Sequence, residues 1–339
     1  MIGQTRVKIL VVKVSSLGDV VHAMPAVQDI RRALPTAQID WVVEPGFAPL
    51  VRRCEGVRRV IECPMRRWRK NLFSGQTRVE WTAFKADLHT AAYDAVIDLQ
   101  GLTKSAIVAW AARLAPQGKR FALGNQTEGS SYEVPTRWVA DVAIKLPVHT
   151  HAVQRSRLLC AQALGYTLDD QLVEFKLLRQ TGIDAGAINT GTNCKPCVAL
   201  VHGTSRADKL WPEQHWLALG QRLMQEGYAL ALPHGNEAEL ARSQRLAYRF
   251  GSDAHVTVWP TLALDDLLDK LGACTGVIGV DSGLSHIAVA LDLPHVQLYN
   301  FETAWRTGPL SAMKRQVSVY GKPVPTTAAV WTAWQQVVA

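Results

Sequence analysis

The sequence has no long uninterrupted apolar run. Its most apolar stretches, such as residues 106–114, contain polar or charged interruptions and are far shorter than the roughly 18 residues that a membrane-spanning helix needs. The N-terminal apolar run has no small-residue cleavage site after it, so we interpret it as a first strand and not as a secretory signal. These absences predict a cytoplasmic protein.

Cysteine is scarce, with six residues in 339, which excludes a disulfide scaffold. Cys194 and Cys197 form a CxxC pair that could indicate redox or zinc chemistry. Neither a second such pair nor a nearby pair of histidines accompanies it. We therefore expect reduced thiols in a loop and predict no metal site.

The glycine patterns of two common nucleotide sites are also missing. The segment after the first apolar run lacks the G-x-G-x-x-G spacing of dinucleotide-binding folds, and residues 201–213 do not fit the Walker A spacing. The sequence therefore disfavours a P-loop ATPase.

Positive charge is present in excess and is concentrated in one segment. The formal net charge is +8, and the segment from Arg52 to Lys85 holds ten Lys and Arg residues against three acids. Such a basic patch attracts nucleic acid, anionic lipid headgroups or a phosphorylated substrate. A solvated helix face is the alternative interpretation.

The chain is long enough for two domains, and short β-branched runs alternate with amphipathic segments in both halves. This alternation predicts two parallel sheets covered by helices. Residues 179–197 are rich in Gly, Thr, Asn and Ala without periodicity, so we predict a linker there. The predicted organisation is an N-terminal domain (1–178), the linker (179–197), a C-terminal domain (198–322) and a closing helix (323–339). The predicted strands are residues 7–14, 39–43, 95–99, 198–202, 228–232, 255–258 and 277–280.

Ligands of open α/β sheets bind beyond the carboxyl ends of the strands, so the residues after each strand matter most. The first predicted strand is followed by Ser15, Ser16, Gly18 and Asp19. A carboxylate at the start of a helix is favoured by the helix dipole and stays ionised. Asp19 is therefore either a helix N-cap or a base presented to a substrate.

The strand at 198–202 is followed by Thr204, Ser205 and Lys209, with Pro212 near the first turn of a helix. Hydroxyl groups and a lysine before a helix N-terminus suit a phosphate group. A turn with a surface lysine is an equally good interpretation of this segment alone.

The strand at 277–280 leads into a second possible anion site, and a weaker signal follows the strand at 228–232. Free backbone N–H groups after the former strand could bind a phosphate. His286 could instead be a buried core histidine and Asp281 an N-cap. After the latter strand, Glu237 could accept hydrogen bonds from a ribose diol, or simply be an acid in the first turn of a helix. The residues of the anion site are Asp281, Ser282, Gly283, Leu284 and His286.

Taken together, these clusters predict a nucleoside diphosphate site in the second domain and an ionised acid in the first. This is the layout of a glycosyl transfer without a metal ion: one domain neutralises the leaving diphosphate while the other activates the acceptor hydroxyl.

The same segments resemble the lipopolysaccharide heptosyltransferases of glycosyltransferase family 9. The similarity runs from Lys8 to about Tyr299, and the DWVVE and RRWRK segments resemble the type I enzymes more than the type II enzymes. It is carried by KVSSLGDVVHAMPA, DWVVEPGFA, RRWRK, YDAVIDLQGLTKSA, HGTSRADKLWPEQHW and VDSGLSHIAVAL.

The resemblance implies a GT-B fold, in which two Rossmann-like doubly wound domains face each other across a cleft. It also implies an inverting transfer of L-glycero-D-manno-heptose from ADP-heptose to the inner Kdo of Kdo2-lipid A, without a cofactor. The site would be the cytoplasmic face of the inner membrane, with the basic patch at 52–85 against the anionic bilayer. The type II enzyme, which acts on the heptosylated acceptor, is the alternative.

The family's catalytic base corresponds to Asp19. Ser205 and Ser282 stand where threonine is common, Leu262 stands where some members have methionine, and residues 124–140 depart from the family, so Arg137 receives no role. The implied donor-binding residues are Thr204, Ser205, Lys209, Glu237, Leu262, Asp281, Ser282, Gly283, Leu284 and His286. The expected acceptor-binding residues are Ser15, Ser16, Gly18, Arg66, Arg67, Arg69, Lys70 and Gln100, with Trp68 among the cations.

Two other functions are compatible with parts of the sequence. A nucleic-acid-binding protein would explain the basic patch, but no recognition motif or aromatic stacking stripe is present. A sugar-nucleotide epimerase would share the two-domain organisation and would act without an acceptor.

Overall fold

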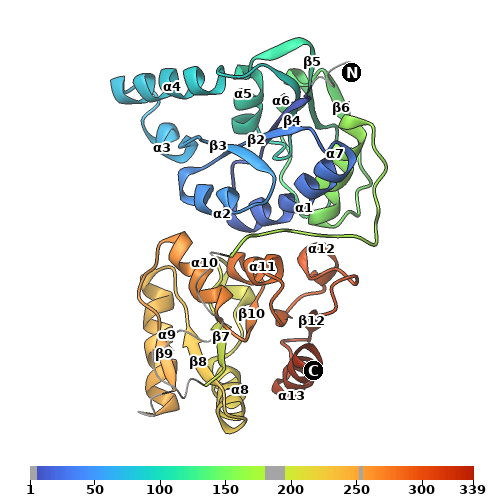
Figure 1. Ribbon diagram of the computed structural model, residues 1–339. Helices are drawn as coiled ribbons and strands as arrows, with labels where there is room; N and C mark the ends of the chain where they lie inside the picture. The colour runs from blue at the N-terminus through green and yellow to red at the C-terminus, as the bar shows by residue number, and fades with distance from the viewer. Residues whose placement is uncertain (1–5, 180–194, 252–254) are drawn as a thin grey trace. The chain divides into compact units, whose positions relative to one another are not determined.

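The computed structural model describes residues 6–179, 195–251 and 255–339. The chain divides into two compact units, Met1–Leu177 and Leu178–Ala339. Each unit is built on one six-stranded parallel sheet with helices packed against it (Figure 1). Most of the predicted linker lies outside the described residues, and Cys194 lies there as well.

The first unit has the strand order β3-β2-β1-β4-β5-β6. Its strands are β1 (Lys8–Val12), β2 (Gln38–Val43), β3 (Val57–Glu62), β4 (Tyr93–Asp98), β5 (Leu114–Leu123) and β6 (Val142–Ile144). Its helices are α1 (Leu17–Ala33), η1 (Pro45–Phe47), α2 (Ala48–Arg52), α3 (Met65–Lys70), α4 (Gly75–Leu88), α5 (Thr103–Ala111), α6 (Pro135–Val139) and α7 (Ala152–Leu164).

The second unit has the strand order β12-β11-β10-β7-β8-β9. Its strands are β7 (Cys197–Val201), β8 (Ala229–Leu232), β9 (Val256–Val258), β10 (Gly276–Val280), β11 (His295–Tyr299) and β12 (Gln316–Tyr320). Its helices are η2 (Ala207–Lys209), α8 (Glu213–Gln225), α9 (Glu237–Phe250), α10 (Leu264–Gly272), α11 (Gly283–Ala290), α12 (Ala304–Thr307) and α13 (Thr327–Val338).

The two sheets have the same topology. Counted from the first strand of each unit, both follow the doubly wound order 3-2-1-4-5-6. In such a sheet the connections diverge on either side of the first strand, which opens a crevice at the carboxyl ends. The switch point lies between β1 and β4 in the first unit and between β7 and β10 in the second.

Burial explains why the central strands are continuous apolar runs. Strands β1 and β10, with the sequences KILVV and GVIGV, are buried along nearly their whole length because helices cover both faces of each sheet. The closing helix α13 packs on the second unit, where Trp331 and Trp334 join the core cluster around β7, β8 and β10. In the parts of the chain that the structure describes, no helix combines the length and apolarity needed to cross a bilayer.

All seven predicted strands are present, with ends shifted by a few residues. The structure adds strands β3, β5, β6, β11 and β12, which the sequence analysis did not predict. Cys197 was expected in a loop, and this was wrong because it begins β7. Trp68, which stands among the cations of the basic run, is buried. Its side chain is 3% exposed and packs edge-on against the rings of Trp81 and Phe84.

Candidate active site

The carboxylate of Asp19 lies at the switch point of the first sheet. The N-cap of α1 is Ser16, and Asp19 is the third residue of the first turn, so the alternative of Asp19 as the N-cap is wrong. The backbone N–H and the hydroxyl of Ser16 both donate to Asp19 Oδ2, at 3.1 and 2.9 Å. These two bonds hold one carboxylate oxygen in place.

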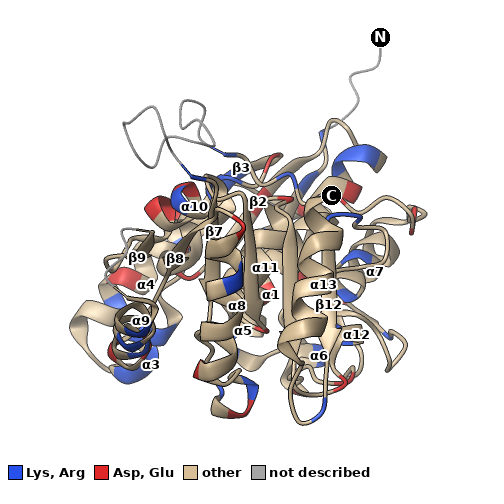
Figure 2. Cartoon of the chain, turned by 90° about the horizontal axis from the view of Figure 1, so that it is seen from below, with Lys and Arg blue, Asp and Glu red and all other residues tan. Residues whose placement is uncertain are grey.

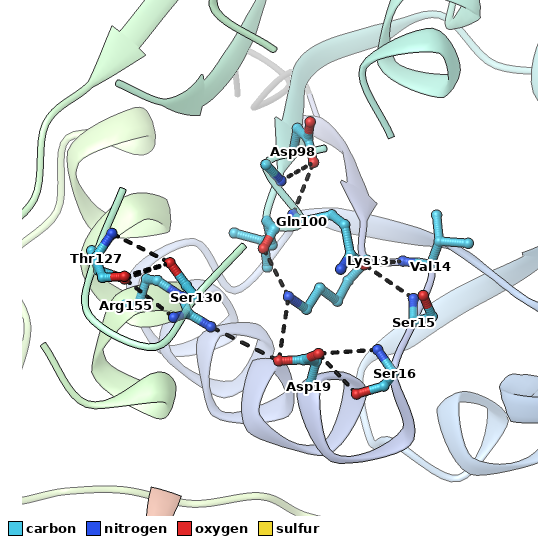
Figure 3. A network of polar contacts seen from close by, with 12 residues as sticks. Lys13, Val14, Ser15, Ser16, Asp19, Asp98, Gln100, Thr127, Ser130 and Arg155 are labelled. Carbon is cyan, nitrogen blue, oxygen red and sulfur yellow. Dashed lines mark hydrogen bonds and ion pairs between the residues drawn. The ribbon is translucent and has the colours of Figure 1, made fainter. Parts of the chain in front are cut away.

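The other oxygen, Asp19 Oδ1, faces two cations. It lies 4.0 Å from Lys13 Nζ and 3.9 Å from a terminal nitrogen of Arg155 (Figure 3). Burial acts to raise the pKa of Asp19, but the Lys13 charge, the hydrogen bonds from Ser16 and the Arg155 charge outweigh it and leave the pKa below its ordinary value. Asp19 is therefore ionised, and only Oδ2 is fixed by hydrogen bonds.

Lys13 follows β1 and is 3% exposed. Its ammonium group donates to the backbone carbonyl of Leu99 at 3.0 Å. Burial lowers the pKa of Lys13 to about 8, although the nearby Asp19 charge acts in the opposite direction. Asp98, at the end of β4, is also buried. Burial raises its pKa to about 6 despite hydrogen bonds from the backbone of Gln100 and Gly101.

Two of the predicted acceptor residues shape the loop after β1. The side-chain carbonyl of Gln100 accepts hydrogen bonds from the backbone N–H groups of Val14 and Ser15, at 3.2 and 3.0 Å. The Ser15 hydroxyl accepts a 2.7 Å hydrogen bond from Lys104, a residue that the sequence analysis did not select. Gly18 lies half-buried in the first turn of α1.

The basic run lies on the short helix α3, where Lys and Arg colour the ribbon blue (Figure 2). Arg66, Arg67, Arg69 and Lys70 are all exposed. Arg67 pairs with Glu80 of α4 at 2.6 Å. Elsewhere in the basic patch, arginines of α2 and β3 pair with acids. These pairs neutralise part of the positive charge of the patch. These pairs are Arg52 with Glu62, Arg58 with Asp40, and Arg59 with Asp40 and Asp87.

In the second unit, the polar residues gather around Asp281 at the end of β10. Lys209 Nζ lies 2.6 Å from Asp281 Oδ2, and His286 Nε2 lies 3.4 Å from Oδ1. Thr204 donates its hydroxyl to the backbone carbonyl of Asp281 at 3.1 Å. Burial acts to raise the pKa of Asp281, but His286 and Lys209 outweigh it and hold the pKa well below its usual range. The buried carboxylate thus fixes the ammonium of Lys209 in place.

The start of α11 adds hydrogen-bond donors beside this cluster. Ser282 is its N-cap, so Asp281 is not, while Gly283 and Leu284 form the first turn, whose N–H groups have no partner within a helix. The hydroxyl of Ser282 is buried and has no hydrogen-bond partner among the described residues. An anion such as a phosphate would satisfy these donors.

A close approach of α11 to the sheet requires glycine at position 279. A Cβ atom there would lie 2.5 Å from the hydroxyl oxygen of Ser285 and 2.8 Å from Cβ of Val201. Both distances are shorter than real Cβ contacts, so a side chain would push α11 and Val201 away from β10. The glycine therefore allows the first turn of α11 to lie close to the sheet.

The remaining predicted donor residues lie in neighbouring loops. Ser205 is exposed, Leu262 is half-buried before α10, and Glu237 is exposed at the start of α9. Glu239, which the sequence analysis did not select, accepts a 2.7 Å hydrogen bond from the backbone of Gly235 and lies against Gly203. Its sequence signal is a second acid in the first turn of α9.

The described residues contain no group of three or more His, Cys, Asp or Glu side chains that could hold a metal ion. Two doubly wound units, one with an ionised aspartate at its switch point and one with cationic and amide donors for an anion, define a glycosyltransferase of the GT-B class.

The comparisons with known proteins agree with this class. The family model of glycosyltransferase family 9 (heptosyltransferase) matches residues 81–330. The chain is 39% identical over 292 residues to lipopolysaccharide heptosyltransferase 1 of Pseudomonas aeruginosa, covering 86% of this chain and 78% of that protein. It is 26% identical over 314 residues to lipooligosaccharide heptosyltransferase 2 of Haemophilus ducreyi, covering 90% and 86%.

The structure resembles that of Escherichia coli heptosyltransferase WaaC with ADP, with a TM-score of 0.82 and 33% identity, covering 97% of this chain and 99% of that chain. The chain belongs to glycosyltransferase family 9, and its similarity is greater to the type 1 than to the type 2 enzymes. The predicted GT-B fold is confirmed. The predicted roles of individual residues, the domain boundaries and the cleft stay predictions.

Proposed function

We propose that the protein transfers L-glycero-D-manno-heptose from ADP-heptose to the inner Kdo of Kdo2-lipid A, with inversion at the anomeric carbon. The observation that carries the chemistry is the ionised Asp19 at the first switch point, with Oδ2 bound by Ser16 and Oδ1 available. The substrates are proposed from the relatives, which include heptosyltransferase 1 enzymes and a heptosyltransferase of known structure with ADP. The type 2 reaction is less well supported because the identity is lower.

In the proposed mechanism, the acceptor hydroxyl attacks the anomeric carbon while the bond from that carbon to the ADP oxygen breaks on the opposite face. Asp19 Oδ1 takes the hydroxyl proton, since Oδ2 is already engaged by Ser16. Lys209, which Asp281 holds in place, and the N–H groups at the start of α11 stabilise the charge on the leaving diphosphate.

The remaining donor contacts are proposed from the resemblance to the family and from the chemistry of the side chains. Thr204, Ser205 and His286 would bind the diphosphate or the sugar, Glu237 the ribose diol, and Leu262 the adenine. The proposed reaction uses no cofactor and no metal ion. On this proposal, residues 1–178 bind the acceptor and residues 198–322 the donor.

The direct test is incubation of the purified protein with ADP-heptose and Kdo2-lipid A, followed by mass analysis of the lipid. We expect the lipid to gain the mass of one heptose residue and ADP to be released. A gain only on acceptor that already carries one heptose would indicate the type 2 reaction. Conversion of ADP-heptose without any acceptor would instead indicate an epimerase.

We further propose that the first unit docks on the anionic cytoplasmic face of the inner membrane. The loop between α3 and α4 exposes Leu72 and Phe73, which are 59% and 88% exposed, directly after the exposed cations Arg69 and Lys70. Apolar side chains flanked by cations bind anionic lipid surfaces, where each cation contributes about 1 kcal/mol.

Replacing Phe73 with serine is expected to weaken binding to vesicles of anionic phospholipid roughly tenfold, because burial of a large apolar side chain contributes about 1.5–3 kcal/mol. Cosedimentation with vesicles measures the effect. Tyr248 of the second unit is 87% exposed, so Tyr248→Ser is the matched control and should bind like the parent protein. Equal binding by the Phe73 variant would remove this loop from the membrane contact.

A further inference from the structure

Three cations from three different elements surround Asp19. Lys13 follows β1, Lys104 lies on α5 and Arg155 lies on α7. Lys13 and Arg155 approach Asp19 Oδ1 at 4.0 and 3.9 Å (Figure 3). Lys104 reaches the Ser15 hydroxyl at 2.7 Å. The charges of Arg66 and Arg69 also act on Lys104. The carboxylates near the group are those of Asp19, Asp98, Glu44 and Glu133. Five cations thus face four carboxylates, so positive charge remains in excess even with every carboxylate ionised.

Lys104 is the cation of this group best placed to receive a ligand. Its side chain is half-buried and forms no ion pair with any of the residues that the structure describes. The nearby carboxylate of Glu44 accepts a 2.8 Å hydrogen bond from the backbone N–H of Arg66. An ammonium group has three donors, so Lys104 keeps two besides the one that it gives to Ser15.

Arg155 supplies a second donor on the other side of Asp19. Its side chain is 10% exposed, and its guanidinium donates to the hydroxyl of Thr127 at 3.2 Å, which fixes the direction of the group. A guanidinium fork matches the two oxygens of a carboxylate, whereas an ammonium group acts as a point charge. Lys104 and Arg155 are partly buried, and a carboxylate bound beside them would stabilise their charges.

We infer that Lys104 and Arg155 form a subsite for the carboxylate of the acceptor sugar acid, beside the hydroxyl that Asp19 deprotonates. This subsite rests on the proposed function and extends it to residues outside the basic run of α3. It makes the negative charge of the acceptor, and not only its hydroxyl, a requirement of the reaction.

The subsite also bears on the strength of the base. The charges of Lys13 and Arg155 lower the pKa of Asp19 and so reduce its proton affinity. An acceptor carboxylate bound between Lys104 and Arg155 would offset part of this positive charge and raise the proton affinity of Asp19. The base would then be strongest when the acceptor is in place.

The test compares two acceptors in each variant: Kdo2-lipid A and its methyl ester, in which the Kdo carboxylates are uncharged. The parent protein should prefer the acid by about 10- to 100-fold in kcat/KM, the usual worth of one charge-assisted hydrogen bond. In Lys104→Met this preference should fall at least tenfold, mostly through poorer use of the acid. Lys104→Arg keeps the charge and should restore most of the preference.

Lys119 on β5 is exposed, so Lys119→Met is the matched control and should keep the full preference of the parent. The ratio between two acceptors in one preparation does not depend on how much of the variant is folded. An unchanged preference in Lys104→Met would overturn the subsite while leaving the proposed function in place. Failure of the parent protein to use the acid at all would contradict the proposed function and the subsite with it.

Discussion

Replacing Asp19 with asparagine is expected to lower the turnover of heptosyl transfer by about 10²- to 10⁴-fold, the usual contribution of a general base. Asparagine keeps the size and the acceptor oxygen that Ser16 uses, so the first turn of α1 should stay intact. The neutral amide cannot take the proton of the acceptor hydroxyl. Single-turnover measurements with saturating ADP-heptose would isolate this step from product release.

The proposed donor site lies in the second unit, so the affinity of the Asp19 variant for ADP should remain close to that of the parent. Asp170 is an exposed aspartate of the first unit, to which Asp19 also belongs, and Asp170→Asn supplies a control with the same chemical change and full activity expected. If the Asp19 variant kept more than about a tenth of the parent's turnover, another group would have to be the base.

Replacing Lys209 with methionine is expected to weaken ADP binding by about 10- to 100-fold, because a hydrogen bond to a charged group contributes about 1.5–3 kcal/mol. Methionine preserves much of the apolar stem while removing the charge that Asp281 holds at 2.6 Å. Calorimetric titration with ADP measures the loss directly, without the acceptor.

Removing Lys209 also leaves Asp281 with one cationic partner fewer, so a thermal melt should accompany the titration. Asp281→Asn separates the loss of the lysine charge from the loss of the ion pair. This variant keeps the ammonium of Lys209 but fixes it less firmly, so ADP affinity should fall less than in Lys209→Met. Lys314 is exposed in the same unit, and Lys314→Met should bind ADP normally. Parent-like affinity in Lys209→Met would exclude Lys209 from the diphosphate site.

The sequence was sufficient to predict the central strands and the parallel class of both sheets, because strands covered on both faces are apolar throughout. β3 and β5 were missed because they are not continuous apolar runs. β3 has the charged sequence VRRVIE, where Arg58 and Arg59 pair with the buried Asp40 of the neighbouring strand. β5 has the sequence LAPQGKRFAL, in which proline, glycine and two cations interrupt the apolar residues. Tertiary pairing allows charged residues in such a strand, and no local pattern reveals the partner.

The candidate site was predictable where its residues follow strands within short segments. Lys209 and Asp281 were each selected from the loop after a strand, and the structure brings them into contact. Lys104 and Arg155 were not selected, since they lie on helices and only the fold brings them to the loop after β1. The one local signal for Arg155 is its position on the buried face of α7, where an unpaired arginine would be costly.

The repeated 3-2-1-4-5-6 strand order gives each unit a crevice at the same point of its sheet. On the proposed function, recognition of the nucleotide sugar and of its recipient is therefore encoded in separate stretches of sequence. Substitutions in one stretch leave the other unchanged, so that related enzymes can evolve to use a new acceptor glycan while keeping the same sugar donor. Engineering of this scaffold could follow the same division, with the loops after β1 and β4 as the places to alter.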